Sequence, residues 1–275
     1  MRPVAPPRVR CTGQLSKLYI TTKWASVKYS QARPFPGGAI NTPPPHGRPL
    51  TTVDVVIFGI VDERLCVLLV RRPRGSGEPF PGLWALPGGF VDIDADASLE
   101  ACALRKLREK TGLRSPYLEQ LGSWGGATRD PRGWAATHVF FALIDSRGVR
   151  LVTGGNAEAV EWHPIAAEGV NERLAFDHAT LLTAAVRRLQ AKVEYTSLPA
   201  FLLPVRFTLR ELQTIYETVL GRTLDKSAFR TRMLSAAFIE PTGKMRSGPN
   251  RPAELYRLIQ RGAVFFPRPF RAGET

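Results

Sequence analysis

The sequence has few cysteines, no long apolar run and no acidic side chain among its first 50 residues. Cys11, Cys66 and Cys102 show neither paired spacing nor a nearby histidine cluster, so we expect free thiols, two of them in a core, and neither a disulfide framework nor a zinc site. No stretch is long and apolar enough to cross a bilayer, and a secretory signal is lacking. A soluble chain in the cytoplasm, with no membrane partner, is therefore expected.

Positive charge is confined to the two ends of the chain. Residues 1–50 contain eight basic residues and no acid, residues 51–199 contain 17 basic and 18 acidic residues, and residues 200–275 contain 13 basic and six acidic residues. Positive charge restricted to segments suits the phosphate backbone of a nucleic acid, because each neutralised phosphate releases counterions. On charge alone, a solvated basic face explains the pattern equally well.

Residues 1–50 also contain nine prolines. This composition cannot bury enough surface to offset the entropy of ordering, so we expect a disordered, basic, proline-rich extension. We interpret it as an over-called translation start, in preference to a basic arm that touches DNA or a transit peptide.

A mixed α/β domain is predicted for residues 51–172, where apolar β-rich runs alternate with turn signals and a capped helix. Its expected elements are strands at 53–60 and 65–70 joined by a polar hairpin turn, a Gly/Pro-rich loop at 73–81, a helix at 98–110 that Gly112 ends, and strands at 137–144 and 159–162. The apolar residues of 176–193 recur at helical spacing, which predicts a linker helix within residues 173–197 and a candidate dimer interface.

A second domain is predicted for residues 198–265, followed by a tail at 266–275. Thr208 and Glu211 fit a capping box, and one apolar face continues from there to Gly221. Asp225 caps a second helix at 226–236, and two strand-like pieces around a basic tip follow at 238–258. Two short helices and a basic wing are typical of a winged helix-turn-helix.

Residues 89–113 resemble the Nudix box, the signature of hydrolases that cleave nucleoside diphosphates linked to another group. Gly89, Arg105, Leu107, Gly112 and Leu113 match the pattern. In the box, three glutamates at helical positions i, i+3 and i+4 share one face and supply the oxygen ligands that magnesium prefers.

Lys106, Glu109 and Lys110 occupy the three glutamate positions of the box here. Exchanging two negative groups for two positive ones repels a divalent cation from the face that should collect it, so we expect no metal site and no required cofactor. The upstream glutamate position falls on Ala97, and the loop after Gly89 is two residues longer than the usual pattern.

Three interpretations of this domain compete. A working hydrolase needs substitute acids, for which the candidates are Asp92, Asp94, Asp96 and Glu100. A scaffold domain would bind nothing. We favour a sensor that binds a nucleotide diphosphate without cleaving it, in which Lys106 and Lys110 neutralise the diphosphate and do the electrostatic work of the metal.

Residues 51 to about 260 resemble the Nudix-related transcriptional regulators of NAD metabolism, the NrtR family. The segments that carry the resemblance are 71–73, 83–91, 129–133, 174–178, 189–195, 207–216, 220–230 and 240–243. The resemblance implies a homodimer that binds a palindromic double-stranded operator near genes of NAD synthesis or salvage, usually as a repressor, with ADP-ribose or a related nucleotide as effector. In that family many Nudix domains are catalytically silent, which agrees with the substitutions, so we expect no hydrolase activity; an active ADP-ribose pyrophosphatase remains the alternative.

Candidate effector-binding residues combine glycines that admit a phosphate, cations that pair with it, aromatic rings that stack on a base, and the degenerate box. They are Arg71, Arg72, Trp84, Gly88, Gly89, Phe90, Arg105, Lys106, Glu109, Lys110, Asp130 and Arg132. For any one of them a purely structural role remains open, as for Trp84 in a core or Arg105 paired with Glu109.

Candidate DNA-binding residues lie on the second helix of the helix-turn-helix and on the wing, where such proteins contact the major groove and the phosphates. They are Lys226, Ser227, Arg230, Thr231, Arg232, Lys244, Arg246 and Arg251.

Overall fold

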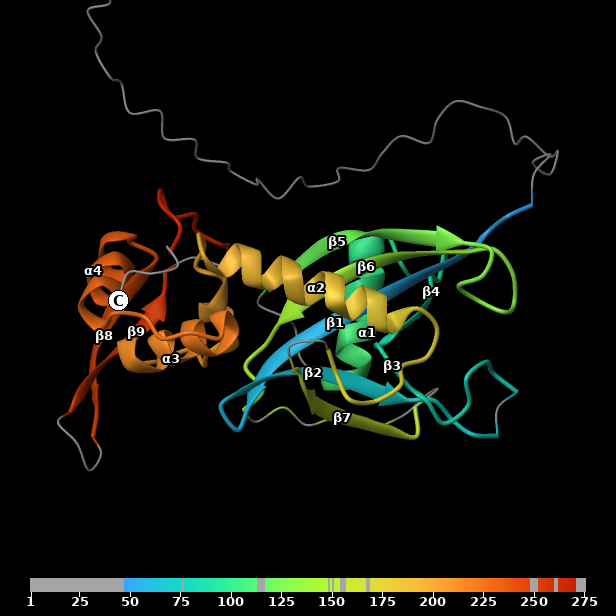
Figure 1. Ribbon diagram of the computed structural model, residues 1–275, viewed down its shortest axis with the longest axis horizontal. Coiled ribbons are helices and arrows are strands. Elements are labelled where there is room, and N and C mark those ends of the chain that lie inside the picture. Colours follow the sequence, from blue (N-terminus) through green and yellow to red (C-terminus); the bar gives the residue numbers. More distant parts are fainter. Residues whose placement is uncertain are drawn as a thin grey trace, which may run out of the picture. The chain divides into compact units, whose positions relative to one another are not determined.

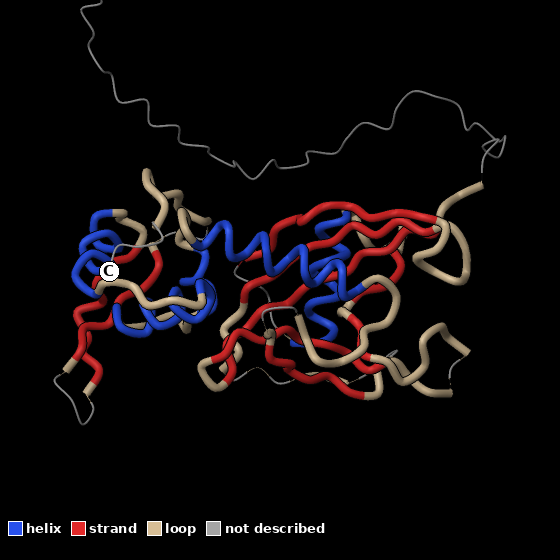
Figure 2. The backbone as a smooth tube through the Cα atoms, viewed as in Figure 1, coloured by secondary structure: helices blue, strands red, loops and turns tan. Residues whose placement is uncertain are grey.

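A mixed sheet forms the centre of the first domain in the computed structural model, which describes residues 47–75, 77–112, 117–147, 149, 151–153, 157–166, 169–247, 252–259 and 262–270. Its strands are β1 (Leu50–Val61), β2 (Arg64–Arg71), β3 (Trp84–Ala85), β4 (Gly88–Phe90), β5 (Tyr117–Gly126), β6 (Ala135–Leu143) and β7 (Ala159–Pro164). The order is β3-β2-β1-β6-β5, with β4 also on β1 and β7 also on β2 (Figures 1 and 2).

β1 lies at the centre of this sheet and shows how the two faces are used. Successive side chains of a strand point to opposite faces. Val53, Val55 and Ile57 belong to the cluster that packs on the helix α1 (Leu99–Thr111), whereas Val56 and Phe58 belong to the cluster that includes α2 (His178–Val193). The predicted hairpin is present, since Val61 and Arg64 are paired across the β1–β2 turn.

α1 begins and ends where the sequence signals predict. The Ser98 hydroxyl accepts a hydrogen bond from the amide of Ala101, and Gly112 closes the helix with φ 67°, a conformation that glycine adopts without a steric cost. These caps fix the start and the end of the helix that carries the degenerate Nudix box.

The second domain is the predicted winged helix-turn-helix. It consists of the short 3-10 helix η1 (Leu198–Leu202), α3 (Leu209–Leu220), α4 (Lys226–Ser235) and the two-stranded wing, β8 (Ile239–Arg246) and β9 (Ala253–Leu258). Thr208 and Glu211 form the expected capping box on α3, and Asp225 caps α4.

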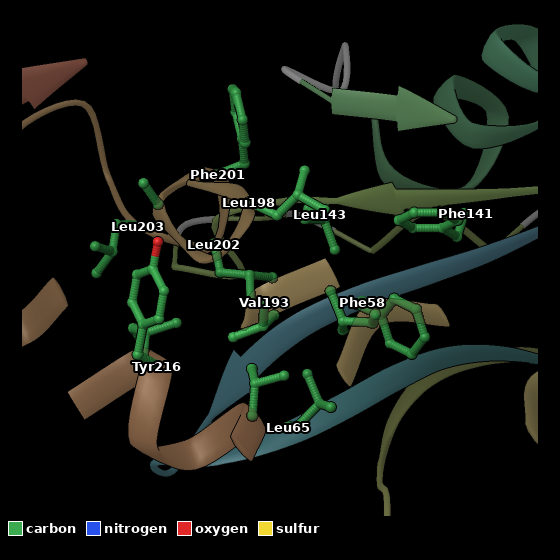
Figure 3. Packing of buried hydrophobic residues seen from close by; sticks show 14 of the residues in the cluster. Phe58, Leu65, Phe141, Leu143, Val193, Leu198, Phe201, Leu202, Leu203 and Tyr216 are labelled. Carbon is green, nitrogen blue, oxygen red and sulfur yellow. The ribbon is translucent and has the colours of Figure 1, made fainter. Parts of the chain in front are cut away.

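The apolar face of α2 joins the two domains through one continuous core. Leu189 and Val193 are fully buried in a cluster that runs from β1 of the sheet to α3 and the wing. Figure 3 shows Val193, Leu198 and Tyr216 in the same buried cluster as Phe58 and Leu143. Residues from Arg48 onward accordingly form one compact unit.

Some sequence predictions need correction. The strand β5 was not expected, and β1 begins at Leu50. Within the segment predicted as a tail, Phe266 and Phe270 are buried among the side chains of the winged helix. Cys66 and Cys102 are buried free thiols, as predicted. The N-terminal extension up to residue 46, Cys11 and Leu113 lie outside the described residues.

Leu189→Ala should destabilise the protein by about 2–5 kcal/mol, because it leaves a cavity in the core that the two domains share. Urea unfolding followed by circular dichroism measures the loss. Arg187→Ala is the matched control on the exposed face of α2 and should change stability by less than about 0.5 kcal/mol. Equal effects of the two substitutions would contradict the shared core.

Candidate functional site

A cleft of about 870 Å³ lies in the first domain, between α1, the β4 region and the start of α2. The residues that line it include six cationic side chains, Arg72, Arg105, Lys106, Lys110, Arg129 and Arg132. Its acidic lining residues are Asp54, Glu78, Asp92 and Glu109. The cleft therefore carries an excess of positive charge and suits an anionic ligand.

The floor of the cleft depends on a close approach between β4 and β1. Gly88 pairs with Asp54, and a Cβ atom at Gly88 would lie 2.1 Å from Asp54 Oδ1 and 2.6 Å from the carbonyl oxygen of Val53. Gly89 has φ 144° and lies against the ammonium of Lys106. Only glycine at these two positions allows the backbone to run so close to its neighbours.

Asp54 is a buried carboxylate, 5% exposed, at the base of the cleft. It accepts a hydrogen bond of 2.7 Å from the Thr137 hydroxyl and lies 3.7 Å from Arg129 Nη2 and 3.7 Å from His178 Nε2. Nδ1 of His178 accepts a hydrogen bond from the amide of Leu86, and burial lowers the pKa of the imidazole. The negative charge of Asp54 is therefore balanced by the guanidinium of Arg129.

Arg129 also binds the start of the linker helix. It donates two hydrogen bonds, of 3.1 and 2.8 Å, to the carboxylate of Asp177, the N-cap residue of α2. Arg129 and His178 both line the cleft, so the cleft reaches the first turn of the helix whose other end packs in the winged helix.

The degenerate box on α1 faces the cleft but its charges are partly compensated. Arg105 donates to both oxygens of Asp96, at 2.7 and 2.5 Å, and to Glu109 at 3.0 Å. This pairing lowers the pKa of Asp96, whose side chain is 1% exposed. Asp96, the neighbour of the Ala97 that occupies the upstream glutamate position, is thus the acid that holds Arg105.

Lys106, Glu109 and Lys110 lie together along one wall of the cleft, as their i, i+3 and i+4 spacing predicts. Lys106 Nζ is 3.8 Å from Glu109 Oε2, and burial lowers the pKa of Lys110. Among the described residues, no group of three or more His, Cys, Asp or Glu side chains is placed to hold a metal ion. This wall does not fit magnesium, because two ammonium groups replace two carboxylate ligands.

The cleft lining contains a second ionic group. Glu78 Oε2 accepts hydrogen bonds from Arg72 at 3.2 Å and from Arg132 at 3.0 Å. The guanidinium of Arg132 also lies over the ring of Phe90, and that of Arg72 over the ring of Phe176, 4.9 and 5.1 Å from the centroids. Phe90 lines the cleft and is 45% exposed, so an aromatic surface is available beside Arg132.

The structure brings most of the predicted effector residues to the cleft. Those that line it are Arg72, Gly88, Gly89, Phe90, Arg105, Lys106, Glu109, Lys110 and Arg132. Arg71 and Trp84 are not among the lining residues: they pair across β2 and β3, next to Val70 and Ala85, which do line the cleft. Alternation along the strands explains the difference.

Trp84 and Asp130 have structural contacts. The Trp84 ring packs edge-on against His163 at 4.5 Å. Asp130, 3% exposed, binds the guanidinium of Arg132 at 3.0 and 2.8 Å and so orients a lining residue without lining the cleft itself.

Sequence reasoning missed several lining residues, which include Thr52, Asp54, Glu78, Arg129, Phe176 and His178. Asp54 had one available signal, an acid inside an apolar strand. Arg129 had a weaker one, since it stood in a segment that carried the family resemblance. The contacts of Glu78 depend on how a loop folds back, which local sequence does not reveal.

Most of the residues predicted to bind DNA lie at the surface of the winged helix. Phe229 and Met233 of α4 are buried, and Lys226, Ser227, Arg230 and Thr231 are exposed. Lys244 is exposed on β8. Arg246 is paired with Glu211 at 2.5 Å, whereas Arg232 lies over the rings of Phe266 and Phe270. Arg251 lies outside the described residues.

Comparison with known proteins agrees with both domains. Residues 50–185 match the NUDIX domain model, and residues 199–258 match the model of the NrtR DNA-binding winged helix domain. The chain is 47% identical over 221 residues to the ADPR responsive transcriptional repressor NtrR of Acinetobacter baylyi, a match that covers 80% of this chain and 86% of that protein. The chain belongs to the NrtR family.

Two further proteins are similar to this NrtR-family chain. The crystal structure of Shewanella oneidensis NrtR complexed with a 27mer DNA matches with a TM-score of 0.73 and 40% identity, over 80% of this chain and 99% of that one. The ADP-ribose pyrophosphatase of Methanocaldococcus jannaschii is 32% identical over 133 residues, 48% of this chain and 73% of that protein. The NrtR-family chain is thus a DNA-binding regulator by its domain pair and a Nudix protein by its first domain. In its described part, no helix is long and apolar enough to span a membrane.

Gly88→Ala should destabilise the NrtR-family chain by about 1–3 kcal/mol, because the new methyl group would overlap the buried Asp54 carboxylate and the β1 backbone. Thermal and urea unfolding measure the change. Gly126→Ala is the control, since a Cβ there meets nothing within 4 Å. Equal stability of the two variants would refute the close approach of β4 to β1.

Proposed function

We propose that this protein is a repressor that binds a palindromic operator as a homodimer, and that ADP-ribose or a related NAD-derived nucleotide in the cleft lowers its affinity for that operator. The names of the relatives support both DNA binding and a response to ADP-ribose, since one is an ADPR responsive repressor and another was crystallised with DNA. We place the target near genes of NAD synthesis or salvage, and its action on the chromosome in the cytoplasm.

The observation that carries this proposal is the cationic cleft built on a damaged metal motif. A diphosphate needs positive partners, and the arginine and lysine side chains that line the cleft supply them. The exposed ring of Phe90 offers a surface on which a base stacks. Lys106 and Lys110 stand where the magnesium ligands of an active Nudix enzyme would be, so the cleft binds its ligand without a metal cofactor.

The same substitutions argue against hydrolysis. Magnesium would neutralise the diphosphate and activate a water molecule, and the wall of α1 lacks the carboxylates to hold it. The carboxylate that remains, Glu109, is paired with Arg105 and lies near Lys106. We therefore assign the Nudix domain no hydrolase activity, so that the signalling nucleotide survives being bound.

A hydrolase is the second candidate, because Asp92 lines the cleft and a pyrophosphatase is among the relatives. Asp96 is removed from the list of substitute acids by its pairing with Arg105. Incubation with ADP-ribose and magnesium decides between the two: sustained release of AMP would support the hydrolase, and intact ADP-ribose the sensor.

Regulation follows from thermodynamic linkage. If ADP-ribose lowers operator affinity by some factor, operator DNA must lower ADP-ribose affinity by the same factor. The cleft reaches the first turn of α2 through Arg129 and His178, and the far end of α2 packs in the winged helix. A change in the position of this helix is therefore the route by which we connect the two sites.

ADP-ribose should bind with the same affinity in EDTA and in magnesium, as measured by isothermal titration calorimetry. Lys106→Gln and Lys110→Gln should each weaken it by roughly 10–100-fold, since a hydrogen bond to a charged group contributes roughly 1.5–3 kcal/mol. Arg108→Gln, on the exposed side of α1, is the charge-matched control and should have little effect. A strict magnesium requirement would exclude metal-free binding.

Two DNA-face substitutions should differ in kind. Arg230→Ala on α4 should relax sequence preference by about 1–3 kcal/mol, because its side chain is placed to read base edges. Lys244→Ala on the wing should weaken binding to all duplexes and reduce the salt dependence by about one charge. Fluorescence anisotropy with matched and scrambled duplexes at several salt concentrations separates the two. Identical behaviour of the variants would contradict this division.

A further inference from the structure

The C-terminal segment, residues 262–270, is tied to the chain that leaves the linker helix. The amide of Phe266 donates to the carbonyl of Tyr195 at 2.7 Å, and the amide of Phe270 donates to the carbonyl of Glu194 at 2.8 Å. Val264 exchanges two more hydrogen bonds with Ser197, of 2.9 and 2.8 Å. The segment lies beyond residues 199–258, which match the winged-helix model. It is nevertheless hydrogen-bonded to the residues that come directly after α2.

The same segment packs against the helix-turn-helix. The ring of Phe270 lies 6.2 Å from that of Phe229 on α4 and 5.5 Å from that of Tyr216 on α3. Phe270 also accepts a hydrogen bond of 3.1 Å from Arg222, in the turn between these helices, through its carbonyl oxygen. Phe270 therefore bridges the C-terminal end of the linker helix and α4.

Arg232 of α4 completes this contact. Its guanidinium lies 4.0 Å from the ring centroid of Phe270 and 5.3 Å from that of Phe266. Both distances are within the range of a cation–π interaction. The face of the guanidinium is thus used within the protein, although the sequence had placed Arg232 among the residues that contact DNA.

α4 needs such support because it buries little of its own surface. Among its ten residues, Phe229 and Met233 are the buried ones. A side chain that reads a base must be held within about 0.5 Å and 10–20° of its productive geometry. Phe229 and Met233 lie four residues apart on one face of the helix, and the contact of Arg232 with the two phenylalanine rings adds a point of attachment outside that face.

We propose that Arg232 and Phe270 are positioning residues, which hold the recognition helix α4 in a fixed orientation relative to the end of the linker helix. In this role they make the protein prefer its operator over other DNA, although they do not contact the DNA themselves. Where the protein responds to a nucleotide, which rests on the function proposed above, they also transmit the position of α2 to α4.

The test uses the full chain, the duplex that it selects from a randomised pool, and a scrambled duplex. Arg232→Gln should weaken binding to the selected duplex by about tenfold and leave the scrambled duplex and the salt dependence unchanged, because a stacking contact and not a phosphate contact is lost. Arg187→Gln, on the exposed face of α2, is the charge-matched control and should behave as the wild type.

Phe270→Ala should reproduce the loss caused by Arg232→Gln, and Phe270→Tyr, which keeps the ring, should restore preference. If Phe270→Ala fails to fold, Phe270→Leu fills the space without a ring and takes its place. Equal weakening on both duplexes, with a salt slope reduced by about one, would show that Arg232 contacts a phosphate and would overturn the proposal. Unchanged preference in Arg232→Gln would overturn it as well.

Measuring operator affinity with and without ADP-ribose distinguishes a failure of this inference from a failure of the proposed function. In the wild type, the ratio of operator dissociation constants with and without ADP-ribose reports the response, and Arg232→Gln should bring that ratio toward one while calorimetry shows unchanged ADP-ribose binding. If the wild type itself gives a ratio of one, the proposed function fails. The comparison of selected and scrambled duplexes still decides the positioning role.

Discussion

The apolar face of α2 has to pack against two domains at once. Leu181 and Leu182 near its start, and Leu189 and Val193 near its end, lie in one buried cluster with residues of the sheet and of the winged helix. Hydrophobic burial is not directional, but a close-packed interior resists gradual deformation and changes between discrete arrangements. A signal that moves the start of this helix must therefore either move the helix as a rigid body or repack the shared core.

The four arginine side chains of the cationic cleft are held in place by ion pairs within the protein. Arg72, Arg105, Arg129 and Arg132 each have carboxylate partners within the protein, so their side-chain conformations are set before any ligand arrives. Such preorganisation removes part of the entropy cost that binding would otherwise carry. The carboxylates that do this are themselves buried or paired, and they are the kind of residue that a motif search for metal ligands overlooks.

The features that were predictable from the sequence are local ones. The β1–β2 hairpin, the caps of α1, the capping box at Thr208 and the cap at Asp225 depend on neighbouring residues, and the structure contains them all. β5 was not predictable, because its glycines and half-buried side chains, with a bulge near Gly122, show no clear alternation. The role of Asp96 depends on how the loop before α1 folds back onto Arg105, and that of Phe270 depends on contacts with Glu194 and Arg222, far along the chain. Periodicity reports neither.

Glu78 joins Arg72 and Arg132 in the lining of the cleft, where it occupies donors that an incoming phosphate would use. An anionic ligand that reaches these arginines exchanges with a carboxylate that is already there, so the net gain is smaller than the number of contacts suggests. The displaced Glu78 belongs to the loop between β2 and β3, which then loses two of its anchors. Occupancy of the cleft would thus be visible as increased mobility of the loop between β2 and β3.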